Sequence, residues 1–328
     1  MQSAEHDLQL RGQPEHFTPF PFHPTGGTAS PGEHTPHVSL CNSGDSQVGL
    51  LNIHGIDFTS SPGKHKPIVS MACELRGDVL HVKETRAWTT LGGFEAFLEH
   101  DGPWLAGCDF PFGQARRFIE NIGWPRDWSA YVAHAGAMSR AEFRAALDAY
   151  RAPRAAGDRE HRRSTDKRAS AISPQKLYGV PVGLMFHAGA PLLQRAEVHL
   201  PSLRETGDNR IVVEAYPGVM VRSLFGRVRY KSDSRAQQSN EQTSVRADII
   251  QALSGRDVRG IYGVNVELSE AQCELIVADK SGDRLDALLC AVQAAWAWRQ
   301  QGARFGCPVD VDPLEGWIAD PSLCSRTR

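Results

Sequence analysis

The sequence lacks closely spaced cysteines and long apolar runs. Its seven cysteines include no Cys-x-x-Cys pair, and an odd number of scattered cysteines argues against a zinc site or a disulfide framework. A reducing, cytoplasmic location fits this usage best. No apolar run approaches the ~20 residues that a membrane helix needs, and the N-terminus lacks the hydrophobic core of a secretory signal. We therefore expect neither a membrane span nor a signal peptide.

The sequence also lacks an excess of either charge. Its 36 Lys and Arg residues oppose 38 Asp and Glu, for a net charge of -2 over 328 residues. This balance offers no global attraction for nucleic acid, so such a partner must be recognised through a local patch. Hydrophobic residues make up 41% of the chain, which is enough for a large core. No pattern indicates an oligomeric state.

The first residues differ in composition from the rest. Residues 1–46 are rich in Pro, His, Gly, Ser and Thr and show no apolar periodicity, which predicts a disordered tail. The histidines of this tail have irregular gaps and no companion cysteines, so metal binding is not expected there. We expect one domain over residues 47–320 and a short C-terminal tail over 321–328.

Residues 48–88 predict three consecutive strands. The first is the apolar run VGLLNIHGIDF, which has strand length and ends in Asp57. Two β-rich segments follow, KPIVSMACEL and DVLHVKETRAW, on either side of Arg76, Gly77 and Asp78. Such a junction is typical of a hairpin.

The pattern then alternates between strands and helices. A fourth strand, WLAGCDF, ends in Asp109, and a fifth, within residues 209–217, contains Glu214 near its end. Residues from about 114 to 205 predict a long, mostly helical insert between them, and further helices are expected over 218–226, 241–254 and 269–279. Right-handed crossovers place strands four and five beside strand one. We therefore expect an α/β fold with a mixed five-stranded sheet of order 3-2-1-4-5.

Two aspartates begin the last helical segment, GDRLDALLCAVQAAWAW, at residues 282–298. Large apolar residues recur along it at helical spacing, and alanines between them allow close packing. Asp283 and Asp286 would lie in its first turn, where free backbone N–H groups favour negative charge. Two explanations are open at this point: the aspartates stabilise the helix start, or they serve a site.

The carboxylates converge in this arrangement. Asp57, Asp109 and Glu214 would share the carboxyl edge of adjacent strands, where ligands bind in open α/β sheets. Asp283 and Asp286 join them if the last helix starts there. Clustered carboxylates repel one another and call for a compensating cation, and oxygen ligands select Mg²⁺ or Mn²⁺. Such ions activate water for phosphodiester hydrolysis.

Several segments, in register, resemble a bacterial domain-of-unknown-function family of predicted RNase H-like nucleases. They are GIDFTSSP, GCDFPFG, RSTDKRASAISPQKLYG, VVEAYPG, the last helical segment and EGWI, within residues 48–320. The final Asp-x-x-Asp is similar to that of Holliday-junction resolvases. The resemblance implies an RNase H-like fold, nuclease activity, and metal binding and catalysis by Asp57, Asp109, Asp283 and Asp286. Glu214 is an extra relative to the resolvases, and it either binds metal or hydrogen-bonds neighbouring loops.

Two rival functions stay open. GIDFTSSP also resembles the first phosphate loop of sugar-kinase and actin-like ATPases, which use ATP. That rival needs a second Asp-Gly phosphate loop and a Gly-rich adenosine motif, and neither stands in a convincing position. The other rival is a nucleic-acid-binding protein with an inert site.

Basic residues offer contacts to a nucleic-acid backbone. Residues 151–168 hold seven Arg or Lys against three acidic residues, and residues 222–235 hold five against one. Both stretches either track phosphates or form solvated surface. The candidate substrate contacts are Arg159, Arg162, Arg163, Lys167, Arg168 and Lys176.

Some aromatic residues also have two explanations. Trp124, Trp128 and Tyr131 either stack on bases or pack in the core, and their helical spacing favours packing. His54, on the first strand, is expected to be a core histidine rather than a general base.

Overall fold

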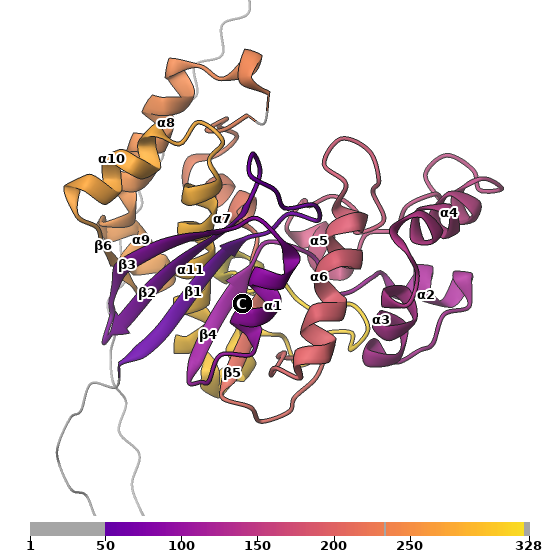
Figure 1. Ribbon diagram of the computed structural model, residues 1–328. Helices are drawn as coiled ribbons and strands as arrows, with labels where there is room; N and C mark the ends of the chain where they lie inside the picture. The colour runs from indigo at the N-terminus through magenta and orange to yellow at the C-terminus, as the bar shows by residue number, and fades with distance from the viewer. Residues whose placement is uncertain (1–49, 233, 325–328) are drawn as a thin grey trace, which may run out of the picture. The chain divides into compact units, whose positions relative to one another are not determined.

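The structure, a computed structural model, describes residues 50–232 and 234–324 and forms a mixed sheet with helices on both faces (Figure 1). The expected tail over residues 1–46 lies outside the described residues, as do 325–328. A short 3-10 helix over Pro321–Leu323 follows the last long helix, and Leu323 is buried. The folded part therefore continues beyond residue 320.

The sheet has the strand order β5-β4-β1-β2-β3-β6. Its strands are β1 (Leu51–Asp57), β2 (Ile68–Arg76), β3 (Val79–Trp88), β4 (Trp104–Cys108), β5 (Arg210–Glu214) and β6 (Asn265–Glu267). β1 pairs antiparallel with β2 and parallel with β4, and β4 pairs parallel with β5. The mixed α/β class is as expected, and β1 lies inside the sheet between β4 and β2.

The expected five-stranded order is wrong at one edge, where β6 pairs parallel with the start of β3. β6 spans only Asn265–Glu267, which is too short to show an alternating pattern in the sequence. Its partner is the half of β3 that follows the hairpin turn. The remaining strands keep the expected neighbours.

Helices cover the two faces of the sheet in separate groups. They are α1 (Leu91–Leu98), α2 (Arg116–Ile122), α3 (Trp128–Gly136), α4 (Arg140–Arg151), α5 (Ser164–Arg168), α6 (Val182–Ala196), α7 (Pro217–Phe225), α8 (Asn240–Leu253), α9 (Arg256–Tyr262), α10 (Glu270–Ala278) and α11 (Asp283–Arg299), with short 3-10 turns at Arg235–Gln237 and Gln301–Gly306. One apolar core joins the sheet to α7–α11, and the other joins it to α1 and the helices between β4 and β5. Figure 1 shows α1 in front of β4 and α11 behind the central strands.

The helical segment between β4 and β5 includes α2–α6. Its helix α4 starts at a capping box, in which Ser139 and Glu142 satisfy each other's backbone N–H groups. None of the helices that the structure describes has the length and apolar character required to cross a bilayer. Within the same residues, six cysteines are free.

Helix α11 lies directly against the backbone of β1 and β4. A Cβ atom at Gly55 would stand 1.8 Å from the carbonyl oxygen of Ala287, and one at Gly107 would stand 2.4 Å from that of Cys290. Only glycine leaves room for this approach, and the alanines of α11 supply the flat surface that meets it. The strand glycines therefore set how close the first turn of α11 comes to the sheet edge.

We expect Gly55→Ala to destabilise the protein strongly, because the added methyl group meets backbone atoms of α11 that cannot rotate away. Overpacking of this kind costs about 1–3 kcal/mol and sometimes more. The matched control is Gly260→Ala on α9, where a Cβ meets no atom within 4 Å. That change should be neutral or stabilise by up to about 1 kcal/mol. Urea unfolding of both variants tests the prediction, and equal losses would contradict it.

Candidate metal centre

The register of β1 and β4 brings Asp57 and Asp109 together. The strands are parallel, with Ile56 opposite Cys108, so the next pair along is Asp57 and Asp109. The backbone N–H of Asp109 donates to the carbonyl of Ile56 over 3.0 Å, which holds the two chain ends side by side. Residues alternate between faces along a strand, so both aspartates share the α11 face with Gly55 and Gly107.

Asp286 completes the group from the first turn of α11. Gly282 precedes this helix as its N-cap and has no side chain to cap it, and the backbone N–H of Arg284 in the first turn donates instead to Asp279 Oδ2 over 2.9 Å. Neither aspartate is therefore explained as a side-chain cap. Asp283 instead accepts a hydrogen bond from Lys66 Nζ over 2.7 Å.

Asp57, Asp109 and Asp286 form a carboxylate trio. Each offers an oxygen within 4.8 Å of the others, and Asp57 and Asp286 are buried. Burial raises the pKa of Asp57 well above its usual range, and repulsion from Asp286, Asp283 and Asp109 raises it further, against an opposing effect of Lys231. Burial and the charge of Asp286 raise the pKa of Asp109 to about 7. In the metal-free protein, burial and mutual repulsion therefore favour the protonated forms of Asp57 and Asp109.

Two side chains of the segment between α7 and α8 partly compensate this charge. The Tyr230 hydroxyl donates to Asp286 Oδ1 over 2.6 Å, and Lys231 Nζ forms an ion pair with Asp286 Oδ2. Burial alone would lower the pKa of Lys231, but the nearby carboxylates outweigh it and hold that pKa well above the usual range. Lys231 is therefore charged, and one ammonium group stands among three carboxyl groups.

The trio suits a hard divalent cation. All three donors are carboxylate oxygens, which is the ligand type that Mg²⁺ and Mn²⁺ prefer. Asp57 and Asp109 also have raised pKa values, so an added positive charge would relieve the repulsion that raises them. Asp283 lies outside the trio, but its charge is near enough to raise the pKa of Asp57.

Glu214 shares the sheet edge but points to the other face. It lies opposite Cys108 in the register of β4 and β5, one position short of Asp109, so its side chain lies on the face covered by α1 and the insert. Its oxygens accept hydrogen bonds from the backbone N–H of Phe112 and from the Arg163 guanidinium. Of the two roles open for Glu214, the structure places it with neighbouring loops rather than with the trio.

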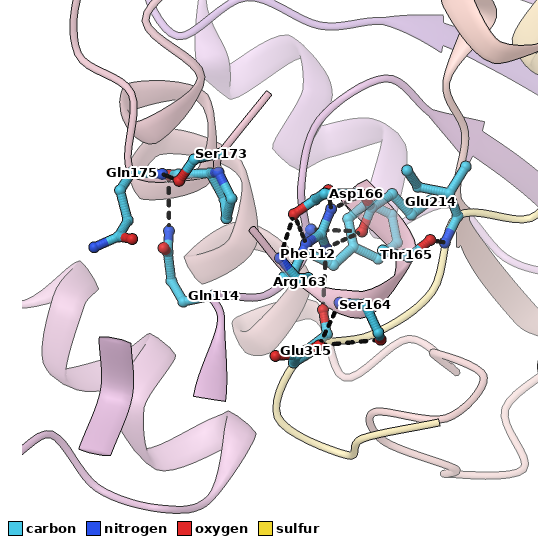
Figure 2. A network of polar contacts seen from close by, with 12 residues as sticks. Phe112, Gln114, Arg163, Ser164, Thr165, Asp166, Ser173, Gln175, Glu214 and Glu315 are labelled. Carbon is cyan, nitrogen blue, oxygen red and sulfur yellow. Dashed lines mark hydrogen bonds and ion pairs between the residues drawn. The ribbon is translucent and has the colours of Figure 1, made fainter. Parts of the chain in front are cut away.

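Arg163 is the centre of a buried polar network, shown in Figure 2. Its guanidinium lies 2.6 Å from Glu214 and 2.8 Å from Asp166, and it also donates to the backbone carbonyl of Glu315. The Glu315 carboxylate in turn accepts from the backbone N–H of Ser164. The buried guanidinium of Arg163 therefore links the insert to β5 and to the EGWI segment, and its charge is balanced by two carboxylates. Arg163 is therefore not exposed for the substrate contact that was expected of it.

The other basic residues of that prediction lie nearer the surface. Arg159, Arg162, Lys167 and Arg168 are exposed, and Lys176 is half-buried. The Arg168 guanidinium lies 5.4 Å from the Trp317 ring and the Lys176 ammonium 5.0 Å from the Tyr178 ring. Their roles as substrate contacts stay predictions.

The aromatic residues considered for base stacking lie in the core. Trp124, Trp128 and Tyr131 are all buried. The Trp128 ring N–H donates to the carbonyl of Phe112, and the Tyr131 hydroxyl donates to that of Leu314. His54 lies with its ring centre 4.8 Å from that of Phe97, and burial lowers its pKa to about 4. It is a neutral packing residue at neutral pH.

Sequence reasoning missed the roles of Tyr230 and Lys231. Lys231 stands in the basic stretch over residues 222–235, but the sequence offers no sign that it turns back onto the trio. Its approach depends on Gly282, where an added Cβ would lie 2.7 Å from Lys231 Cβ. A lysine beside a glycine from another segment is a tertiary feature, so only the fold reveals it.

Fold and site together define a mixed α/β protein with a buried carboxylate trio at the edge of its central parallel strands. The family described as "Protein of unknown function (DUF429)" matches residues 55–311, and the chain belongs to this family. The expected membership of a family of unknown function is confirmed. The match includes the trio and Lys231. No curated protein and no solved structure matches the chain.

The raised pKa of Asp109 predicts a pH dependence in the metal-free protein. Folding raises this pKa from 3.8 to about 7, so the folded state holds an extra proton between these values. Stability should therefore fall as pH rises toward 7, by at most about 1.4 kcal/mol per pH unit for one proton. Asp109→Asn is neutral at every pH and should flatten the curve. Urea unfolding in EDTA between about pH 5 and 8 measures the free energy of unfolding of the wild type and of Asp109→Asn. An equal dependence on pH in the two proteins would contradict the prediction.

Proposed function

We propose that the chain is a metal-dependent nuclease with an RNase H-like fold, which hydrolyses phosphodiester bonds in nucleic acid. The observation that carries the proposal is the trio of Asp57, Asp109 and Asp286, whose carboxylate oxygens lie within 4.8 Å of one another. Mg²⁺, or Mn²⁺ in its place, is the proposed cofactor. Asp283, paired with Lys66, borders the proposed site and remains the fourth candidate ligand. A cytoplasmic location stays a prediction from the cysteine spacing.

The order of the strands supports the RNase H-like part of the proposal. Three antiparallel strands precede two that are parallel to the first, and the first strand lies in the middle. The trio comes from the end of strand one, the residue after strand four and the last long helix. These are the positions that the resemblance to the superfamily implies for its metal-binding carboxylates.

The trio, Tyr230 and Lys231 have different proposed roles in the reaction. A bound ion supplies positive charge and activates water for attack on phosphorus. Asp57, Asp109 and Asp286 would hold the ion, and Tyr230 fixes the orientation of Asp286 through its hydroxyl. Lys231 and Asp109 line the same cavity, so the Lys231 side chain borders the space beside the trio. It is placed to neutralise a phosphate oxygen of the substrate.

One observation favours a second candidate, a nucleic-acid-binding protein with an inert site. Lys231 already supplies one positive charge to Asp286, as a protein cation does where no metal is used. The two candidates differ in one measurable property, because only the nuclease gains stability from Mg²⁺ through the trio.

The decisive experiment combines cleavage with thermal melting. Labelled single-stranded, duplex and branched DNA and RNA are incubated with Mg²⁺ or Mn²⁺, and with EDTA as the control. We expect metal-dependent cleavage, and a melting temperature that rises with Mg²⁺. At a hundredfold excess over Kd the stabilisation is about 2.7 kcal/mol, and each kcal/mol corresponds to roughly 2–4 °C in a chain of this scale.

Asp109→Asn should lower cleavage by more than about a hundredfold, since loss of even an indirect metal partner costs 10–100-fold. It should also remove the Mg²⁺-dependent rise in melting temperature. Asp248→Asn, which removes an exposed carboxylate on α8, is the matched control and should keep both. A Mg²⁺ response that survives Asp109→Asn would contradict the metal site. ATP hydrolysis without nucleic-acid cleavage would favour the kinase-like rival.

A further inference from the structure

An apolar cavity of about 250 Å³ opens beside the trio. Its charged lining residues are Asp109, Arg163, Asp166, Glu214 and Lys231. Most of the remaining lining is apolar and includes Ile172, Val180 and Met185. Ile172 and Val180 are exposed although they are large apolar side chains. Exposed apolar groups at the rim of a cavity are typical of a ligand site.

A second cavity, of about 340 Å³, is also lined by Tyr216. Its charged lining residues are Arg222, Arg227 and Arg229, and no acidic residue lines it. Among the described residues, Arg227 and Arg229 are exposed and neither forms an ion pair. The Arg222 guanidinium donates to the backbone carbonyl of Ala169, so Arg227 and Arg229 supply the two exposed guanidinium groups of a cavity that suits a phosphate.

Tyr216 is the shared wall of the two cavities. Its ring packs against Gly218, where an added Cβ would lie 2.9 Å from the ring carbons. Two consecutive residues also join the cavities, because Tyr230 lines the arginine cavity and Lys231 lines the apolar one. The two cavities therefore adjoin at Tyr216, and the apolar cavity reaches the trio at Asp109.

We propose that one unpaired strand of nucleic acid crosses Tyr216, with a base in the apolar cavity and a neighbouring phosphate in the arginine cavity. This inference rests on the proposed nuclease function and names its substrate class as single-stranded nucleic acid. Alternating apolar and cationic sites match the alternation of bases and phosphates along a strand. The apolar cavity is smaller than the roughly 300–1,000 Å³ of drug-sized sites, which suits one base.

The size of the apolar cavity also argues against a duplex as the bound form. Bases in a duplex are paired and stacked, so none of them enters a cavity unless it is first extruded at a cost of a few kcal/mol. An unpaired strand presents its bases without this cost. The single-stranded segment therefore binds more tightly than a duplex of the same sequence.

Fluorescence anisotropy in EDTA tests the strand path without turnover. The probes are short fluorescein-labelled DNA and RNA single strands and their duplexes. The double variant Arg227→Gln/Arg229→Gln should bind single strands roughly tenfold more weakly, and its salt slope should fall by about 0.7 for each lost phosphate contact. The matched control is Arg126→Gln/Arg144→Gln, which removes two exposed arginines of the insert and should change neither quantity.

A second double variant, Ile172→Asn/Val180→Asn, tests the apolar cavity. Both side chains are exposed, so the fold tolerates the change. Binding of single strands should weaken severalfold at an unchanged salt slope, because no phosphate contact is lost. Binding of duplexes should not change.

The outcomes separate this inference from the nuclease itself. An unchanged salt slope in the Arg227/Arg229 variant overturns the strand path even if cleavage is observed. Binding with the predicted slopes but without metal-dependent cleavage supports the path and overturns the nuclease. A wild-type protein that binds duplexes more tightly than single strands, or binds neither, also overturns the path.

Discussion

The contact between the backbone of α11 and the neighbouring strands β1 and β4 is the constraint on which the site depends. Gly55 and Gly107 remove the side chains that would otherwise hold the helix away from the sheet. Because α11 sits this close, Asp286 in its first turn reaches the aspartates that end β1 and follow β4. The same contact excludes water from the helix–sheet boundary, since α11 is buried over most of its length. Packing and electrostatics at this edge therefore have one cause.

The carboxylates on the two faces of the sheet edge differ in how far their charge is compensated. On the insert face, Arg163 lies between Asp166 and Glu214, so the buried negative charge is closely matched by hydrogen-bonded cations and N–H donors. On the α11 face, the three carboxyl groups of the trio have one directly paired ammonium, that of Lys231. The raised pKa values of Asp57 and Asp109 follow from this shortage of positive charge as well as from burial. This partly compensated cluster is the physical basis of the proposed metal centre.

Much of the fold and part of the site could be predicted from the sequence. Apolar runs that end in an aspartate located β1 and β4, and right-handed crossovers placed them side by side, so Asp57 and Asp109 were found from local pattern and topology alone. β6 was missed because three residues carry no periodic signal. The face of Glu214 depends on a one-residue register between parallel strands, which composition does not encode. Lys231 was missed because it returns to the trio across a long stretch of sequence.

Crystals of the protein soaked in Mn²⁺ test the central claim most directly, because the anomalous scattering of this ion locates it without assumptions about activity. The account predicts an anomalous peak in contact with carboxylate oxygens of Asp57, Asp109 and Asp286. The peak should be absent from Asp109→Asn crystals treated in the same way. An empty trio in wild-type crystals, with Lys231 still paired to Asp286, would contradict the claim that these carboxylates form a metal centre.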